Sequence, residues 1–128
     1  MRLHLENETP PTRVTSYGDG YVVVNEERHT TSLILFPNRV ESNWAISSPE
    51  DLTDDDIVHL VADRPAIILV GTGRTQRFPP SEILQPAYAQ GIGVEVMNTM
   101  AACRTFNVLA SENRDVVAAI IIEPAPEP

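Results

Sequence analysis

The chain has 128 residues, of which 42% are hydrophobic and 5% aromatic, and it carries a net charge of −9. A chain of this length folds as one domain and buries about two thirds of the surface of its unfolded form, so its core needs neither disulfides nor a metal. The acidic charge argues against nucleic acid as the main partner, because phosphate binding depends on clustered cations.

All nine basic residues are arginines, and this excludes several enzyme classes. Without lysine the chain has no P-loop lysine and no Schiff-base or pyridoxal chemistry. Its single cysteine, Cys103, forms no internal disulfide, which agrees with a reducing compartment. The N-terminal residues resemble neither a signal peptide nor a transit peptide, and no apolar run approaches the ~20 residues of a membrane span. We therefore expect a cytoplasmic protein without membrane insertion.

In the N-terminal half, the sequence predicts β structure. Residues 1–12 are polar and end in two prolines, so we expect an irregular start. The β-prone runs 14–17 and 21–25 flank Gly-Asp-Gly, a pattern typical of a hairpin, and they predict a two-stranded ribbon. Residues 28–36 are expected to form one further strand, and residues 43–46 a short one.

From residue 48 onward, strand and helix patterns alternate. A cap and an acidic first turn predict a short turn at 48–51 and a helix at 54–63. The expected order then continues with a strand at 66–70, an interrupted helix at 81–90, a strand at 92–97, a helix at 99–112 and a strand at 115–123. This alternation predicts an α/β domain over residues 13–123 with a parallel first crossover. Residues 124–128 are expected to be a disordered tail.

The stretch PAIILVGTG supplies the first candidate for a site. Gly71, Thr72 and Gly73 follow a buried strand, and Thr99 begins a helix after the next strand. Ligands of open α/β sheets gather at the carboxyl ends of the strands, so we expect these two turns at one sheet edge. The alternative is that the glycines only permit a tight turn, because the motif is neither GxGxxG nor a Walker motif.

Arginines follow this turn without any nearby acid. Arg64, Arg74 and Arg77 lie in a window, 64–80, that contains no Asp or Glu. They either pair with acids from elsewhere or attract an anionic ligand to the turn. Both interpretations remain open from the sequence.

Glu95 is the carboxylate of most interest. It lies in a strand that we expect to be central, and a buried carboxylate needs a partner or a raised pKa. We expect an ion pair with Arg74, Arg77 or Arg104; the alternative is a functional acid or base.

The helix at 99–112 carries four further residues of interest. Its periodicity turns Cys103 inward, where a thiol packs as a small hydrophobic group. Asn107 flanks the buried stripe and is expected to bind the backbone of the Gly71–Gly73 turn. Met100 and Val108 face outward, which indicates a partner surface.

No complete catalytic or metal motif is present. The three consecutive aspartates at 54–56 splay around a helix start, and His59 is expected to pair with Asp55. We expect no metal and no cofactor, and the sequence identifies no catalytic residue, which leaves enzymatic activity undecided.

The order of a YGDGY hairpin, a strand leading to Trp44, IILVGTG and then GIGVEVMNTMAACRTFNVLASENRDVVAAII resembles the Mth-nine-three-eight-like family, a small α/β domain of unknown function. The resemblance covers residues 12–122. It implies one three-layer domain with a mixed central sheet, flanking helices and a projecting β-ribbon. Its eukaryotic members include respiratory complex I assembly factor 3, which acts through protein contacts, and no activity, cofactor or metal is established for it. The pattern positions are Gly71, Thr72, Gly73, Glu95, Met97, Thr99, Ala102, Asn107 and Leu109.

Two functional hypotheses follow. The first is a non-catalytic binding or assembly module with a protein partner. The second is a protein or enzyme that binds an anionic small molecule at the Gly71–Gly73 edge. The candidate pocket for either consists of Gly71, Thr72, Gly73, Arg74, Arg77, Glu95, Met97, Thr99, Cys103 and Asn107.

Overall fold

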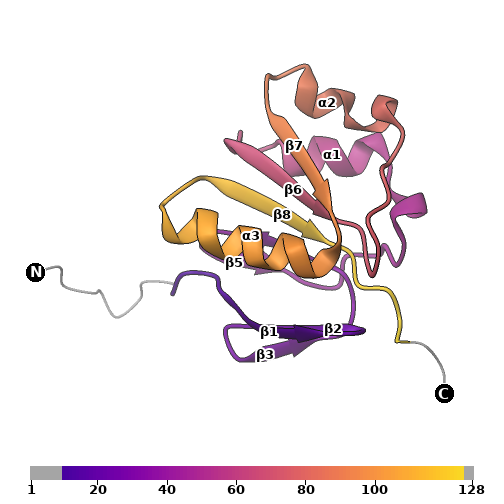
Figure 1. Ribbon diagram of the computed structural model, residues 1–128. Helices are drawn as coiled ribbons and strands as arrows, with labels where there is room; N and C mark the ends of the chain where they lie inside the picture. The colour runs from indigo at the N-terminus through magenta and orange to yellow at the C-terminus, as the bar shows by residue number, and fades with distance from the viewer. Residues whose placement is uncertain (1–9, 126–128) are drawn as a thin grey trace, which may run out of the picture.

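The computed structural model describes residues 10–125 and shows a mixed α/β fold with two sheets (Figure 1). A three-stranded ribbon contains β1 (Val14–Gly18), β2 (Tyr21–Val24) and β3 (Glu27–His29), all antiparallel. The expected disordered tail lies mostly outside the described residues, and so does most of the expected irregular start.

The central sheet has five strands in the order β5-β4-β8-β6-β7. Its strands are β4 (Leu33–Phe36), β5 (Arg39–Glu41), β6 (Ile67–Gly71), β7 (Gly93–Met97) and β8 (Val116–Ile120). Strand β6 runs parallel to β7 and β8, whereas β4 pairs antiparallel with β8 and β5, so the sheet is mixed as expected.

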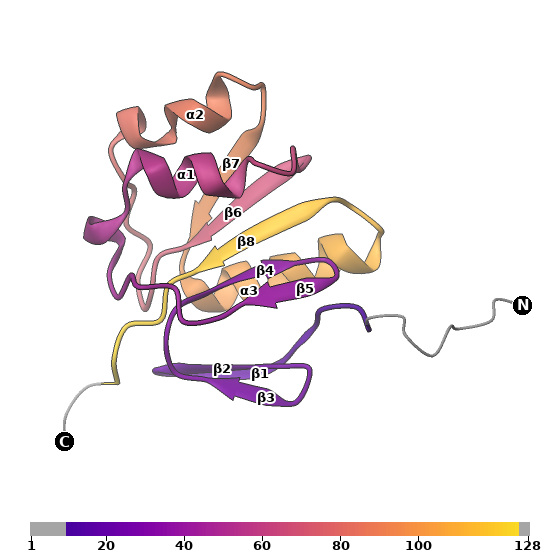
Figure 2. The ribbon, with the colours of Figure 1, turned by 180° about the vertical axis from the view of Figure 1, so that it is seen from behind.

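Helices cover both faces of this sheet. The 3-10 turns η1 (Pro49–Asp51) and η2 (Ser81–Leu84) accompany α1 (Asp54–Leu60) and α2 (Gln85–Tyr88), and α1 and α2 lie on one face. The long helix α3 (Thr99–Ser111) and the ribbon lie on the other face (Figure 2). This arrangement gives the three layers that the sequence analysis expected.

The core consists of two apolar clusters that the sheet separates. Successive side chains of a strand point to opposite faces, so Ile68 and Val70 join the cluster under α1 and α2, whereas Leu69 joins the cluster under α3. All five residues of β8 are buried, and each face of the strand contributes to one cluster. The apolar run in the sequence therefore marks a central strand.

Two strand predictions were wrong. The expected strand at 28–36 is divided between the ribbon and the central sheet, and buried Ser32 lies at the crossing, where its hydroxyl accepts a hydrogen bond from the N–H of Ile122 (2.8 Å). The strand expected at 43–46 is absent. Asn43 has a φ of 59°, which does not suit a strand, and the chain instead forms β5 directly after a two-residue turn at Pro37.

The expected helix at 54–63 ends at Leu60, and Arg64 just before Pro65 has a φ of 51°. Ile57, Leu60 and Val61 are buried as expected. Thr53 caps α1 in a capping box with Asp56.

The strand containing Glu95 was expected to be central, but β7 lies at the edge of the sheet. The order of strands cannot be derived from the local pattern, because β8 is last in the sequence and still pairs between β4 and β6.

Candidate functional site

The end of β6 and the start of α3 meet at one edge of the sheet. The N–H of Gly73 donates to the hydroxyl of Thr99 (2.8 Å), and the N–H of Thr99 donates to the carbonyl of Gly73 (2.9 Å). The Thr99 hydroxyl also donates to the carbonyl of Ile121 (2.6 Å), at the end of β8. Thr99, which follows β7, is thus bonded to residues just after β6 and β8, so it connects the carboxyl-terminal ends of three strands. The structure therefore brings the two predicted turns together.

Glycine is required at this edge for two different reasons. A Cβ atom on Gly71 would lie 3.0 Å from the Cα atom of Thr99, so the helix start packs directly on the strand end. Gly73 has a φ of 99°, a conformation that side chains disfavour, and a Cβ there would collide with Glu123. Close packing therefore explains the glycines without a bound nucleotide.

Thr72 is buried, and its side chain forms hydrogen bonds with the loop that follows it. Its hydroxyl donates to the carbonyl of Thr75 (2.6 Å) and accepts from the N–H of Arg77 (3.1 Å). Its own N–H donates to the carbonyl of Met97 (2.9 Å). Thr72 therefore fixes the loop at residues 72–80, which we call the arginine loop, and places Met97 beside the turn.

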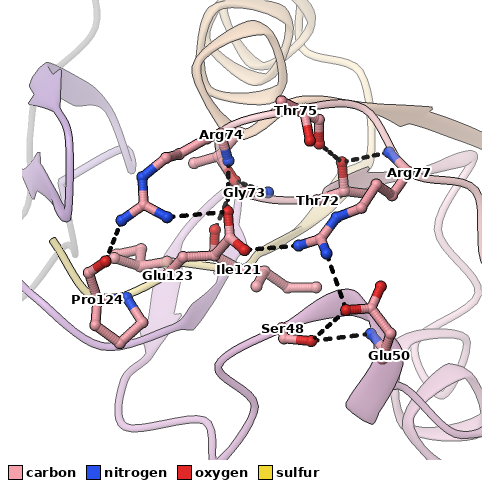
Figure 3. Close-up of polar contacts among 12 residues, drawn as sticks. Ser48, Glu50, Thr72, Gly73, Arg74, Thr75, Arg77, Ile121, Glu123 and Pro124 are labelled. Atoms are coloured by element: carbon pink, nitrogen blue, oxygen red, sulfur yellow. Dashed lines mark hydrogen bonds and ion pairs between the residues drawn. The ribbon is translucent and has the colours of Figure 1, made fainter. Parts of the chain in front are cut away.

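Glu123 forms ion pairs with both arginines of the arginine loop (Figure 3). Its carboxylate accepts from Nη2 of Arg77 (2.6 Å) and from the backbone N–H of Arg74 (2.8 Å), and Nη1 of Arg74 lies 3.6 Å away. The Glu123 side chain is only 17% exposed. A mostly buried carboxylate between two guanidinium groups stabilises the loop more than a fully exposed pair would.

Further acids complete a chain of alternating charges. Arg77 also binds Glu50 of η1 (2.9 Å), and Arg74 binds Asp19 in the β1–β2 turn (2.8 Å) and the carbonyl of Pro124. Of the two interpretations of these arginines, pairing with distant acids is the one that the structure shows for Arg74 and Arg77.

The acid partners were missed by the sequence analysis, although a signal for one of them exists. Glu123 comes after the apolar run of β8, and Thr72 comes after the apolar run of β6. Because parallel neighbouring strands end at the same edge of a sheet, this position could have placed Glu123 near the turn. Glu50 and Asp19 give no such signal, because their position depends on how η1 and the ribbon pack.

Glu95 does not join this network. It lies on the edge strand β7, its side chain is exposed, and within residues 10–125 it forms no ion pair with an arginine. The expected pairing with Arg74, Arg77 or Arg104 is therefore wrong. Arg104 instead donates to the hydroxyl of Tyr17 (3.2 Å).

Asn107 connects α3 to the ribbon rather than to the turn. Its side-chain oxygen accepts from the N–H of Val14 (2.9 Å), and its amide nitrogen donates to the carbonyl of Val14 (2.7 Å). The expected contact with the Gly71–Gly73 backbone is wrong, because Asn107 lies two turns of helix beyond Thr99.

Cys103 is buried in the cluster under α3, as expected. Burial raises the pKa of the Cys103 thiol from its ordinary value of 9.0 to about 12, and neighbouring Arg104 only partly opposes this effect. A thiol with such a pKa is neutral at physiological pH and is a poor nucleophile.

The histidine in α1 also has a different partner from the expected one. Nε2 of His59 lies 2.6 Å from a carboxylate oxygen of Glu41 in β5, and no ion pair joins it to Asp55 among residues 10–125. Residues 10–125 contain no group of three or more His, Cys, Asp or Glu side chains that could hold a metal ion.

A cavity of about 310 Å³ opens beside Gly73, between the ribbon tip and the start of α3. Arg74 and Arg104 contribute positive charge to its wall, Asp19 and Glu123 contribute negative charge, and Met100 contributes an apolar surface. On the outer side of α3, Met100 and Val108 are exposed as expected, by 40% and 56%.

Residues 14–121 match the model of a family described as a protein of unknown function, DUF498/DUF598. The chain belongs to the DUF498/DUF598 family. It is 34% identical to a Bordetella pertussis protein described as a Mth938-like domain, with a TM-score of 0.79 over 98% of this chain and 94% of that one. This likeness confirms the resemblance and the fold class that the sequence analysis proposed.

Curated relatives of this DUF498/DUF598 protein carry two kinds of name. The human NADH dehydrogenase (ubiquinone) 1 alpha subcomplex assembly factor 3 is 38% identical over 87% of this chain, and the chain spans 61% of the length of that relative. A Francisella tularensis protein called 13 kDa major membrane protein is 33% identical over 94% of this chain and 99% of its own length. In the part of the chain that the structure describes, no helix has the length and apolar character needed to cross a membrane.

Proposed function

We propose that this protein is a non-catalytic, assembly-type module that acts through protein contacts. The observation that carries the proposal is that the arginines beside the Gly71–Gly73 turn pair with acids of the same chain. Glu123 binds both Arg74 and Arg77, which supports the interpretation that these arginines pair with acids of the chain over the interpretation that they attract a small anion. The assembly-factor name of the human relative supports the same conclusion.

The one cysteine and the histidine of α1 also favour binding over catalysis. Cys103 is buried with a raised pKa, and His59 lies on the surface in contact with Glu41. Neither group lies in the wall of the cavity beside Gly73. Nucleophilic catalysis needs a nucleophile and a base within hydrogen-bonding reach of each other.

The proposed partner is a subunit of a respiratory NADH dehydrogenase before its incorporation into the enzyme. This choice follows from the name of the relatives and applies to this chain only as part of the proposal. The proposal places the protein in the cytoplasm.

Affinity purification of the tagged protein from its source organism tests this function. Cross-linking before lysis retains short-lived complexes, and mass spectrometry should show one or more NADH dehydrogenase subunits enriched over an untagged strain. Failure to recover any reproducible partner from membrane and cytosolic fractions would contradict the proposal.

The second candidate function is binding of an anionic small molecule in the cavity beside Gly73. One observation favours it: Asp19 and Glu123 both pair with Arg74, whereas Arg104 in the same wall donates a hydrogen bond to Tyr17 and forms no ion pair among residues 10–125. Arg104 is therefore the cation available to a ligand. A thermal-shift screen with phosphates, nucleotides and carboxylic acids should raise the Tm of the wild type but not of Arg104→Ala, and no shift with any compound would remove this candidate.

A further inference from the structure

Strand β7 exposes unpaired backbone groups along the edge of the central sheet. Thr72 directly follows β6, and its N–H donates to the carbonyl of Met97. The backbone groups of Met97 therefore face β6. Since successive residues of a strand direct these groups to opposite sides, the N–H and C=O groups of Val94 and Val96 face outward. Within residues 10–125, only the Val96 carbonyl has a partner, the side-chain amide of Gln76 (2.9 Å).

The two edges of the sheet differ in how they resist pairing with another chain. At one edge, β5 has only three residues, and charged Arg39 and Glu41 occupy its ends. Short, charged strands discourage edge-to-edge pairing. At the other edge, β7 has five residues without proline or basic side chains. The β7 edge is therefore the one open to an additional strand.

Val94 and Val96 form one apolar face of β7, and Glu95 lies on the other face together with Gly93 and Met97. Val94 and Val96 are half-buried and pack against the cluster under α1 and α2, which leaves part of each free for a further contact. On the opposite face, Glu95 is exposed, and Gly93 has open space around it. An added strand would thus meet valines on one face and a carboxylate on the other.

We propose that β7 binds an extended segment of a partner protein as a sixth strand of the sheet, with a Lys or Arg of that segment beside Glu95. Backbone hydrogen bonds to Val94 and Val96 supply affinity, and the alternating side chains supply specificity. This inference rests on the proposed function, because it names the surface through which the assembly module contacts its partner.

Charge selects a basic partner segment over a second copy of this chain. Pairing two β7 strands across a two-fold axis would bring Glu95 close to its own copy, and like charges across neighbouring strands are destabilising. Each chain also carries a net charge of −9, which opposes self-association. A basic side chain would pair with Glu95 without displacing any ion pair among residues 10–125.

The side chain of Gln76 lies where the backbone of the added strand would bind Val96. Its amide group binds the Val96 carbonyl as the N–H of a neighbouring strand would. The partner must displace this side chain, so Gln76→Ala should strengthen binding by a few-fold.

Two peptides test the inference directly. Each peptide has nine residues that alternate between valine and threonine, except for the central residue, and both peptides carry the same solubilising groups at their ends. The central residue is Lys in one peptide and Glu in the other. NMR should show that the Lys peptide slows hydrogen exchange of the Val94 and Val96 amides and binds at least tenfold more tightly than the Glu peptide. Glu95→Lys should reverse this preference, whereas Glu26→Lys, an exposed acid on the ribbon, should not change it.

The inference is overturned if neither peptide protects the two amides at millimolar concentration, or if wild-type protein binds both peptides equally. Val94→Pro removes an outward N–H and should fold while losing the peptide. Glu95→Pro is its matched control, because it removes an N–H that faces β6 and should destabilise the sheet.

Affinity purification separates failure of this inference from failure of the proposed function. If the wild type recovers a partner and Glu95→Lys and Val94→Pro recover it equally well, the β7 edge is not the interface and the proposed function stands. If the wild type recovers no partner, the proposed function fails, and the peptide experiment alone decides whether the edge accepts a strand.

Discussion

Glu123 and Glu95 show how two carboxylates of one chain have opposite roles. Glu123 is mostly buried and contacts Arg74 and Arg77, whereas Glu95 is exposed on β7. Glu95 was chosen from the sequence because its strand was expected to be central. Periodicity gives the face on which a side chain lies but not whether its strand is central, and exposure depends on both.

Glu123→Gln should lower the free energy of unfolding by about 1–2 kcal/mol, because it leaves two guanidinium groups without their shared carboxylate. Glu95→Gln is the matched control and should change stability by less than about 0.5 kcal/mol. Urea denaturation of the three proteins measures the difference. Equal stabilities would show that Glu123 does not hold the arginine loop.

The Cys103 thiol predicts a pH dependence with a defined sign. Its pKa is 9.0 ordinarily and about 12 in the folded protein, so between these values the unfolded chain binds fewer protons than the folded one. Stability should therefore fall as pH rises from about 9 toward 12. Cys103→Ala should lack this component, and the difference in Tm between the two proteins isolates it. Parallel pH profiles for the two proteins would contradict the buried, neutral thiol.

At the scale of elements, local patterns predict most helices and strands but not which sheet a strand joins. The Gly18–Gly20 hairpin, β6 and α3 follow from turn residues and periodicity. The sequence did not show that β3 belongs to the ribbon, because the turn before it places Asn25 and Glu26 at positive φ, and glutamate gives no signal for that conformation. The division at Ser32 depends on packing between the ribbon and β8.

Asn107 is the polar connection between α3 and the ribbon. Asn107→Ala leaves the N–H and C=O of Val14 without their partner and should cost about 1–3 kcal/mol. Hydrogen exchange should accelerate in β1 and β2 more than in the central sheet. Val108→Ala, one position further on the exposed side of α3, should leave both stability and exchange nearly unchanged. Uniform acceleration across both sheets would mean that Asn107 does not hold the ribbon specifically.

At the scale of the whole molecule, the charge network connects parts that the sequence leaves unrelated. Asp19 of the ribbon, Glu50 of η1 and Glu123 after β8 converge on two arginines of one loop. The sequence predicted the place, since strand ends meet at one edge, but left open whether the arginines pair with acids of the chain or attract an anionic ligand. Because Arg74 and Arg77 pair with acids of the chain, the proposed binding surface is the β7 edge.

We propose that the protein assists assembly of a respiratory enzyme through protein contacts. The most direct test is the amount of fully assembled NADH dehydrogenase in the membranes of a deletion strain, measured by native gel electrophoresis, with another respiratory enzyme as internal control. We predict a selective loss of the assembled enzyme that wild-type protein and Cys103→Ala both restore. An unchanged amount of assembled NADH dehydrogenase in the deletion strain would contradict the claim.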